Sequence, residues 1–258
     1  MIATKGVRKS YGPSVVLDDV TVDLPKNALT AIIGPNGAGK STLLAVVSRL
    51  LGMEAGSASV DGLDVTRTPS DVLARKLSIL RQDNHMTARL TVRDLVSFGR
   101  YPYSRGRLTA QDHAQVDRAL DWLDLRPLAG RFLDELSGGQ RQRAFAAMVV
   151  CQDTDYILLD EPLNNLDMKH AQAVMTLLRR MCSELGKTVV VVLHDINFAS
   201  WYSDHIVALK DGRLCRHGST AEIMTAEALR EIYDMEIDII DCGGRRLAIY
   251  YGAQALSA

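Results

Sequence analysis

Apolar residues follow more than one period along this chain, and the changes of period outline its architecture. Apolar and polar residues alternate over 16–24, which predicts a half-buried antiparallel strand near the start of the sequence. Nearly uninterrupted aliphatic runs at 28–33, 156–159 and 189–192 are typical of strands buried on both faces of a sheet. Helical patterns separate these runs, so we expect an α/β fold with a parallel sheet core and an N-terminal antiparallel β subdomain.

A different pattern fills the middle of the chain. Apolar residues recur at helical spacing between about 91 and 151, and we expect an inserted helical subdomain over about 83–151. Farther on, short apolar runs at 206–209 and 213–215 flank Lys210-Asp211-Gly212, which predicts a hairpin. Residues from about 220 to 258 are expected to form a small α/β appendage. Because the sequence has no internal repeat and no Gly/Ser linker, we expect a single domain over 1–258.

Composition narrows the classes of function. Basic and acidic residues number 30 and 31, so no bulk charge favours nucleic acid or an anionic membrane surface. The 4 cysteines lie far apart and form no C-x-x-C pair, which argues against zinc ligation and a disulfide framework. The apolar runs fall short of the roughly 20 residues that span a bilayer, and the first residues lack the apolar core of a secretory signal. We therefore expect a cytoplasmic chain that reaches a membrane only through a protein partner.

The clearest chemical motif lies between the 28–33 strand and a helix-compatible run at 43–47. Its residues are Gly34, Pro35, Asn36, Gly37, Ala38, Gly39, Lys40, Ser41 and Thr42, which fit the phosphate-loop pattern G-x-x-x-x-G-K-[ST]. The glycines let backbone N–H groups point at phosphate oxygens, and the helix N-terminus adds a favourable potential. Lys40 can neutralise the β and γ phosphates, and the Ser41 hydroxyl can ligate magnesium. The motif therefore predicts a site for ATP and Mg²⁺.

Two carboxylates follow the buried strand at 156–159. Asp160 is expected to hold magnesium, and Glu161 to polarise the attacking water as a general base. The alternative is an acidic pair that simply faces solvent at a strand end. The complete phosphate loop in the same chain favours the functional interpretation.

With these residues in place, the chain resembles the nucleotide-binding subunit of ATP-binding-cassette (ABC) transporters over essentially its whole length. The resemblance extends to several motifs that occur in the order typical of the family. Tyr11 matches the residue that stacks on adenine, Gln82 the residue that senses magnesium and the γ-phosphate, and His194 the histidine at the γ-phosphate. Leu136-Ser137-Gly138-Gly139-Gln140 matches the family signature, and 164–167 with Asp167 matches the loop at the dimer interface. It implies the ABC-type fold of the phosphate-loop NTPases and an ATPase activity coupled to transport.

The resemblance also implies a set of site residues. Those expected to act in catalysis are Lys40, Gln82, Glu161 and His194, and those expected at the metal are Ser41, Gln82 and Asp160. Besides the phosphate loop, the expected nucleotide contacts are Tyr11, Val16, Ser137, Gly138, Gly139, Gln140 and Asp167. Without the other motifs, Tyr11 reads as a turn tyrosine, Gln82 as an exposed strand end and His194 as the neighbour of a helix cap. The remaining histidines, His85, His113, His170, His205 and His217, are expected at the surface or in packing.

Partners follow from the family as well. Because residues 137–139 open a helix, they offer a second anion-binding N-terminus, and the family pairs two subunits head to tail around ATP. We therefore expect a homodimer that works with permease subunits and a periplasmic or extracellular substrate-binding protein, with no nucleic acid. The expected location is peripheral, on the cytoplasmic face of the cell (inner) membrane.

One segment points to a branch of the family. Gly99-Arg100-Tyr101-Pro102-Tyr103 resembles the G-R-Y-P sequence of ATPases that serve ferric-siderophore importers. Met148 stands where many members of the family have arginine, and in this respect the sequence resembles the same branch. An ordinary turn at a helix end is the alternative. In the family, the region from about Gln82 to Tyr103 receives a helix of the permease, so Arg100 and Tyr101 are expected to dock it. Residues 161–167 depart from the commoner S-A-L-D form of the interface loop but retain Asp167.

The leading interpretation is an ATPase that energises uptake of a ferric siderophore through a separate permease. A first alternative keeps the ATPase and changes the cargo to haem, vitamin B12 or another metal chelate. A second is an ATPase of the same superfamily that acts on nucleic acid or ribosomes, which the balanced charge disfavours. A third is a catalytically silent module, which the presence of Lys40, Asp160, Glu161 and His194 disfavours.

Overall fold

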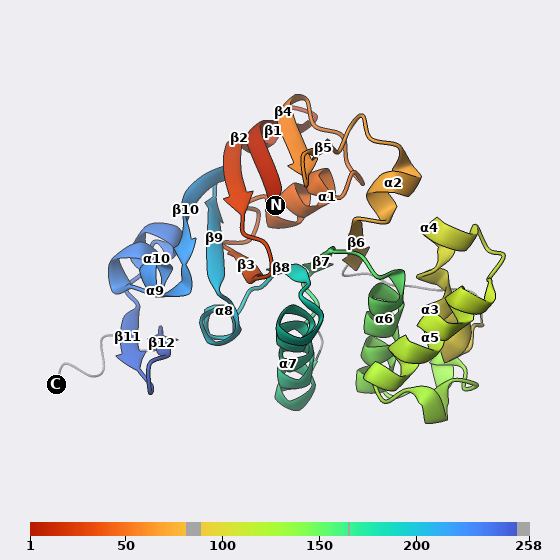
Figure 1. The fold of residues 1–258 in the computed structure, drawn as a ribbon. Helices are drawn as coiled ribbons and strands as arrows, with labels where there is room; N and C mark the ends of the chain where they lie inside the picture. Colours follow the sequence, from red (N-terminus) through yellow and green to blue (C-terminus); the bar gives the residue numbers. More distant parts are fainter. Residues whose placement is uncertain (81–88, 165, 252–258) are drawn as a thin grey trace. The chain divides into compact units, whose positions relative to one another are not determined.

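The computed structural model describes residues 1–80, 89–164 and 166–251 (Figure 1). Gln82, His85 and Asn165 therefore lie outside the described residues. The chain separates into two units, the first formed by 1–67 and 175–258 and the second by 68–174.

The first unit carries most of the strands. Its elements are β1 (Ile2–Tyr11), β2 (Ser14–Leu24), β3 (Leu29–Ile33), α1 (Lys40–Val47), β4 (Ala55–Val60), β5 (Leu63–Asp64), β8 (Thr188–Val192), α8 (Ile196–Tyr202), β9 (His205–Lys210), β10 (Arg213–Ser219), α9 (Thr220–Ile223), α10 (Ala226–Tyr233), β11 (Asp238–Asp241) and β12 (Arg246–Ile249). The long helix α7 (Met168–Leu185) begins in the second unit and ends in the first.

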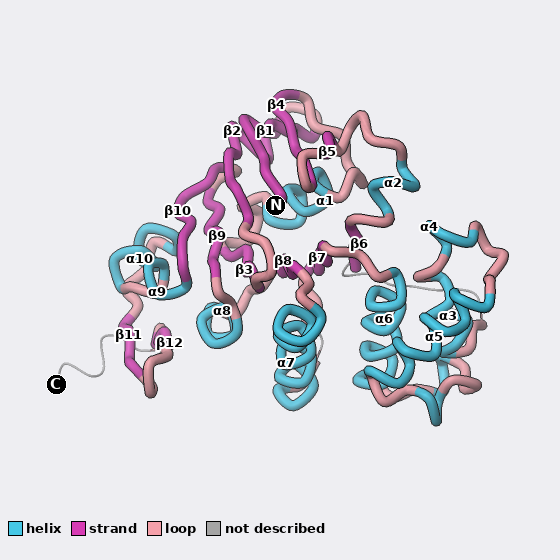
Figure 2. The backbone as a smooth tube through the Cα atoms, in the orientation of Figure 1, coloured by secondary structure: helices cyan, strands magenta, loops and turns pink. Residues whose placement is uncertain are grey.

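The second unit is mainly helical. Its elements are α2 (Ser70–Ala74), β6 (Leu77–Leu80), α3 (Val92–Phe98), α4 (Tyr101–Ser104), α5 (Ala110–Trp122), the 3₁₀ turns Arg126–Leu128 and Leu133–Glu135, α6 (Gly138–Gln152) and β7 (Tyr156–Asp160). Figure 2 shows α3, α5 and α6 gathered together, and the three pack on one another.

The alternating pattern near the start of the chain forms an antiparallel sheet, as predicted. The strand order is β2-β1-β4-β5, and Leu17, Val20, Val22 and Leu24 of β2 turn their side chains into the core. Helix α1 packs against β2 and β4. Period-2 burial of this kind fixes the register, because a slip of one residue would expose the whole apolar face.

The uninterrupted aliphatic runs form parallel strands, which confirms the expected α/β core. In the first unit β3 lies between β8 and β9 and is parallel to both, with Leu29 opposite Val189 and Thr30 opposite His205. Every residue of β3 and β8 is buried. In the second unit β7 pairs in parallel with β6. Strands buried on both faces need apolar side chains at every position, which is why these runs do not alternate.

Three helices of the second unit, α3, α5 and α6, begin at side chains that satisfy some of their first backbone N–H groups. Thr91 with Asp94, Thr109 with Asp112, and Ser137 with Gln140 form capping boxes at α3, α5 and α6. Each cap leaves fewer unsatisfied donors at the helix start and so fixes where the helix begins. The predicted helical character of 91–151 is thus present, while the limits of an inserted subdomain stay a prediction.

The predicted hairpin joins β9 and β10 through Asp211 and Gly212. Both residues have positive φ, 49° and 77°, and Lys210 pairs with Arg213, which is the geometry of a two-residue hairpin turn. This turn rests on β2: the Asp18 N–H donates to the Gly212 carbonyl over 2.8 Å, and a β-carbon at position 212 would lie 2.6 Å from the Val16 carbonyl oxygen.

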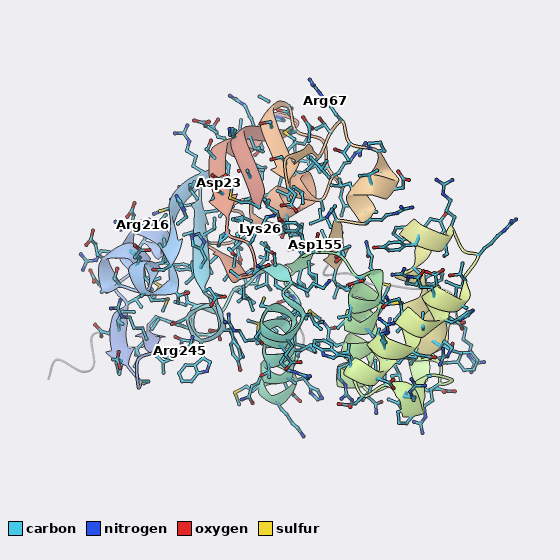
Figure 3. All side chains as sticks on the ribbon, in the orientation of Figure 1. Asp23, Lys26, Arg67, Asp155, Arg216 and Arg245 are labelled. Atoms are coloured by element: carbon cyan, nitrogen blue, oxygen red, sulfur yellow. The ribbon has the colours of Figure 1, made fainter. Side chains whose placement is uncertain are left out.

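The last helices and strands are attached to the rest of the first unit by polar contacts. Arg216 of β10 pairs with Glu227 over 3.3 Å and also with Glu231 of α10, and Figure 3 shows it beside these helices. Arg245, next to β12, donates to the Trp201 carbonyl of α8 over 2.6 Å. The helices and strands between 220 and 251 are thus attached to β10 and α8, and the appendage expected over about 220–258 stays a prediction.

All four cysteines are free thiols. Burial raises the pKa of Cys151 to about 12 and that of Cys182 to about 11, whereas Cys242 is exposed. Within the described residues, no helix has both the length and the apolar character needed to cross a bilayer.

The close approach of the Gly212 turn to β2 can be tested against a matched turn. Asp61-Gly62 joins β4 to β5 with φ values of 51° and 77°, and a β-carbon at Gly62 would meet nothing within 4 Å. We expect Gly62→Ala to lower the free energy of unfolding by about 1–2 kcal/mol, the usual cost of a left-handed non-glycine residue. Gly212→Ala should cost more, because its methyl group meets the Val16 carbonyl. Urea unfolding of both variants measures the difference, and equal losses would contradict the proposed steric contact.

Candidate functional site

The phosphate-loop motif joins β3 to α1 in the first unit. Gly39 is the N-cap of α1 and has a φ of 94°, and a β-carbon there would lie 2.7 Å from the Val16 carbonyl oxygen and from a methyl group of Leu17. Only glycine fits both the left-handed backbone and the narrow gap to β2. The same contact places Val16, an expected nucleotide contact, directly against the loop.

Lys40 lies inside the loop. Its residue is only 5% exposed, and its Nζ donates to the carbonyl oxygens of Gly34 and Pro35 over 2.8 Å each. A buried ammonium group is costly unless oxygen atoms surround it, and here the loop's own carbonyls do so. Ser41 follows in the first turn of the helix. The loop therefore holds a positive charge and a helix N-terminus within one short segment.

Tyr11 and His194 belong to the same unit as the loop. Tyr11 ends β1, is 52% exposed, and has Lys9 Nζ 5.9 Å from its ring centre. His194 follows β8, and the Leu193 N–H donates to the Ile32 carbonyl of β3 over 3.1 Å. Because parallel neighbours end at the same sheet edge, His194 emerges at the edge where the phosphate loop starts.

The alternative for His194, a neighbour of a helix cap, is also visible. The cap of α8 is Asp195, whose carboxylate accepts from the N–H groups of Asn197 and Phe198 over 2.7 and 3.1 Å. The cap is thus made by Asp195 and not by His194.

In the second unit, the signature residues open α6 as predicted. Ser137 is the N-cap, its hydroxyl accepts from the Gln140 N–H over 3.3 Å, and the Gln140 side chain accepts from the Ser137 N–H over 3.0 Å. Gly138 and Gly139 form the first turn of this 15-residue helix. The two glycines add no bulky side chain of their own to this helix N-terminus, which suits an anionic ligand.

Asp160 is the last residue of β7, and Glu161 begins the loop after it. Glu161 has a φ of 50°, a left-handed conformation that a non-glycine residue adopts at a cost. Its Oε2 accepts from the Asn164 amide over 2.6 Å. Asn164 belongs to the stretch that departs from the usual loop sequence, and here it orients the expected general base.

Asp167 is held by His170, a residue to which the sequence assigned no role. The Asp167 Oδ1 accepts from the His170 backbone N–H over 2.8 Å and lies 2.7 Å from the His170 Nδ1. These two hydrogen bonds hold the pKa of Asp167 below its usual range, and the bond from the His170 backbone N–H contributes the most. The spacing of three residues at the start of a helix is the one signal in the sequence that could have linked them.

Comparison with known proteins decides the family. The family model described as "ABC transporter" matches residues 17–164. The chain belongs to the ABC transporter family.

Relatives of this ABC chain that match over nearly their whole length are named as import or transport ATP-binding proteins. It is 52% identical over 251 residues to "Petrobactin import ATP-binding protein YclP" of Bacillus subtilis (strain 168), covering 97% of this chain and 100% of the relative. It is 40% identical to "Ferric enterobactin transport ATP-binding protein FepC" of Escherichia coli (strain K12), covering 96% and 93%. A solved ATP-binding cassette, dimeric in a post-hydrolysis state with ADP and Pi, matches with a TM-score of 0.74 and 30% identity over 85% of this chain and 99% of that one.

These comparisons confirm the predicted family, the ABC-type fold and the ABC ATPase class. The roles of individual site residues stay predictions. Gln82 cannot be placed, because it lies outside the described residues.

One expectation for this ABC subunit needs correction. Arg100 was expected to dock a permease helix, but its side chain is only 6% exposed. Its Nε donates to Asp112 Oδ1 over 2.9 Å, its Nη1 donates to the Cys151 carbonyl over 3.0 Å, and its guanidinium lies 3.9 Å from the centre of the Tyr103 ring. Arg100 therefore binds α4, α5 and α6 together. Tyr101, the next residue, is 62% exposed.

The Asp112 carboxylate has two structural tasks in this ABC subunit. Hydrogen bonds from Thr109, with a further contribution from Arg100, hold the pKa of Asp112 below its usual range although burial opposes them. It thus stays charged at neutral pH, caps α5, and neutralises the buried guanidinium.

Removing Arg100 should leave that carboxylate buried without its cation. We expect Arg100→Met to lower the free energy of unfolding by about 3–5 kcal/mol, as for other broken buried pairs. Adding Asp112→Asn should recover part of the loss, because it removes the orphaned charge. Tyr101→Ala, one residue away and exposed, serves as the control and should be nearly neutral. Urea unfolding measures all of these, and a neutral Arg100→Met would contradict the assigned role.

Proposed function

We propose that this chain is the ATP-hydrolysing subunit of an importer for a ferric siderophore, which it energises through a separate permease. The observation that carries the proposal is the full-length similarity to a petrobactin import ATP-binding protein. Gly99-Arg100-Tyr101-Pro102-Tyr103 supports the same branch of the family.

The phosphate loop is proposed to bind the triphosphate of ATP. Lys40 is already buried in the loop with its ammonium against two carbonyl oxygens, so phosphate oxygens can replace or join these acceptors. Val16 and the exposed ring of Tyr11 are proposed to contact the nucleotide on the adenine side.

Magnesium is proposed to accompany the nucleotide. The Ser41 hydroxyl and the Asp160 carboxylate are hard oxygen donors, which fit this ion, and Gln82 stays a predicted ligand. Bound magnesium would neutralise charge on the transferred phosphoryl group.

Glu161 is proposed to accept a proton from the attacking water, and His194 to contact the γ-phosphate. The geometry that supports Glu161 is its position at the end of a buried strand, with one carboxylate oxygen fixed by Asn164. A positioned carboxylate of this kind can act as a general base.

The N-terminus of α6 and the loop around Asp167 are proposed to face the nucleotide of a second copy. This requires a homodimer, with Ser137, Gly138, Gly139 and Gln140 completing the partner's site. The remaining partners are permease subunits and an extracellular or periplasmic substrate-binding protein, and the proposed location is the cytoplasmic face of the cell membrane. Tyr101 remains a proposed permease contact.

The catalytic assignment has a direct test. We expect Glu161→Gln to lower the turnover of ATP by about 10²-fold or more, the usual scale of general-base loss. The same variant should still form dimers when ATP is added, because its nucleotide contacts are intact. Phosphate release and light scattering measure the two properties. Glu184→Gln, on the exposed side of α7, is the control and should behave as wild type, whereas normal turnover of Glu161→Gln would remove the base role.

The cargo has a separate test. In cells that lack the chromosomal copy of this chain, uptake of iron-55 as ferric petrobactin should return with the wild-type chain and not with Glu161→Gln. Uptake of haem and of vitamin B12 should be the same with either chain. If the wild-type chain restores haem or vitamin B12 uptake and leaves ferric siderophore uptake unchanged, the cargo assignment fails while the ATPase assignment stands.

A further inference from the structure

The imidazole ring of His170 occupies the space that a side chain at Gly139 would need. A β-carbon at position 139 would lie 2.1 Å from His170 Cδ2 and 2.5 Å from His170 Nε2. At Gly138, the preceding residue, a β-carbon would meet nothing within 4 Å, and neither glycine has a left-handed backbone. The space at position 139 is therefore limited by His170 and not by the backbone conformation.

The ring cannot move aside without breaking a second contact. His170 Nδ1 lies 2.7 Å from Asp167 Oδ1, and the His170 backbone N–H donates to the same oxygen over 2.8 Å. One face of this side chain thus rests on the signature helix α6 while one ring nitrogen holds the interface-loop carboxylate. His170 connects two motifs that lie far apart in the sequence.

A second contact ties the same loop to the same helix. Gln142 Nε2 donates to the Pro162 carbonyl oxygen over 3.1 Å, and Pro162 follows Glu161 directly. Positions 139 and 142 are three residues apart and lie on one face of α6. Helix α6 therefore contacts the loop that carries Glu161, Asn164 and Asp167 at two places, near the start of the loop and just after its end.

We propose that His170 is a positioning residue that couples Asp167 to the N-terminus of the signature helix. The inference rests on the proposed function, in which both groups face the nucleotide of a second copy. Because His170 joins them, the helix N-terminus and the loop reach that nucleotide in one fixed arrangement, and Glu161 shares the loop. His170 acts in this way on closure of the dimer and on turnover.

Two substitutions separate the contacts of His170. His170→Asn keeps an N–H donor near the position of Nδ1 and removes the ring from Gly139, whereas His170→Phe keeps a ring and removes the donor. In the Glu161→Gln background we expect both to weaken ATP-driven dimerisation by about 10-fold, within the usual range for coupled sites. In the wild-type background both should lower kcat, with unchanged binding of ATP to the monomer and an unchanged unfolding midpoint.

His113→Asn is the matched control, because His113 is exposed on α5. It should leave dimerisation and turnover at the wild-type level. Wild-type dimerisation of either His170→Asn or His170→Phe would overturn the coupling role. A lowered unfolding midpoint in both, with a proportionate loss of all activities, would reduce His170 to a structural residue and also overturn it.

A double-mutant cycle tests the contact itself. Gly139→Ala should reduce turnover strongly in the wild-type chain and much less in the His170→Ala chain, where the ring no longer fills the space. Gly138→Ala should have the same effect in both chains, because its methyl group meets open space. An equal effect of Gly139→Ala in the two chains would overturn the proposal.

Failure of the proposal and failure of the proposed function give different results. If Glu161→Gln alone forms no dimer with ATP, the proposed function fails whatever the His170 variants do. If it forms a dimer that His170→Asn and His170→Phe leave unchanged, only the coupling role of His170 fails.

Discussion

Burial of the Lys40 ammonium is the constraint on which the phosphate loop depends. A cation removed from water has to be met by oxygen atoms, and the loop turns the Gly34 and Pro35 carbonyls inward to do this. In the same loop, Gly39 passes within contact of β2, next to the Val16 carbonyl oxygen. The fully buried strand β3 supplies the rigid base from which the loop starts. The loop is therefore held from two sides, by the hydrogen bonds of the Lys40 ammonium and by the contact of Gly39 with β2. A substitution at either place is expected to disturb the shape of the loop.

In the second unit, side chains rather than backbone carbonyls hold the charged groups of the proposed site in place. Asp160 ends a buried strand, and Glu161 begins the loop that follows. Short polar contacts hold this loop: the Asn164 amide donates to Glu161, the Gln142 amide donates to the Pro162 carbonyl oxygen, and His170 contacts Asp167. Each contact is exposed or half-buried and adds little to stability by itself, because water competes for exposed pairs. Their value is geometric, since together they fix the direction of two carboxylates.

The sequence predicted well those features that depend on local periodicity. Alternation located β2, uninterrupted aliphatic runs located β3, β7 and β8, and Ser137 marked the start of α6. It failed where a contact joins distant residues. Arg100 stands beside an exposed tyrosine in a turn, and nothing near it in the sequence reveals that its partners are Asp112 and the Cys151 carbonyl. His170 belongs to no motif of the sequence. Its ring rests on Gly139, which lies in another segment, so no short stretch of sequence reveals this contact. Such contacts are properties of the packed chain and not of any short window.

The four cysteine thiols differ in how far the fold buries them, and therefore in their reactivity. Thiolates react and thiols do not, so the raised pKa values of Cys151 and Cys182 make these two groups inert at neutral pH. Cys215 is half-buried, and burial raises its pKa as well. Cys242 is exposed between β11 and β12. A maleimide dye or spin label will therefore attach first at Cys242, which gives the unmutated chain a built-in reporter position for distance measurements between two copies.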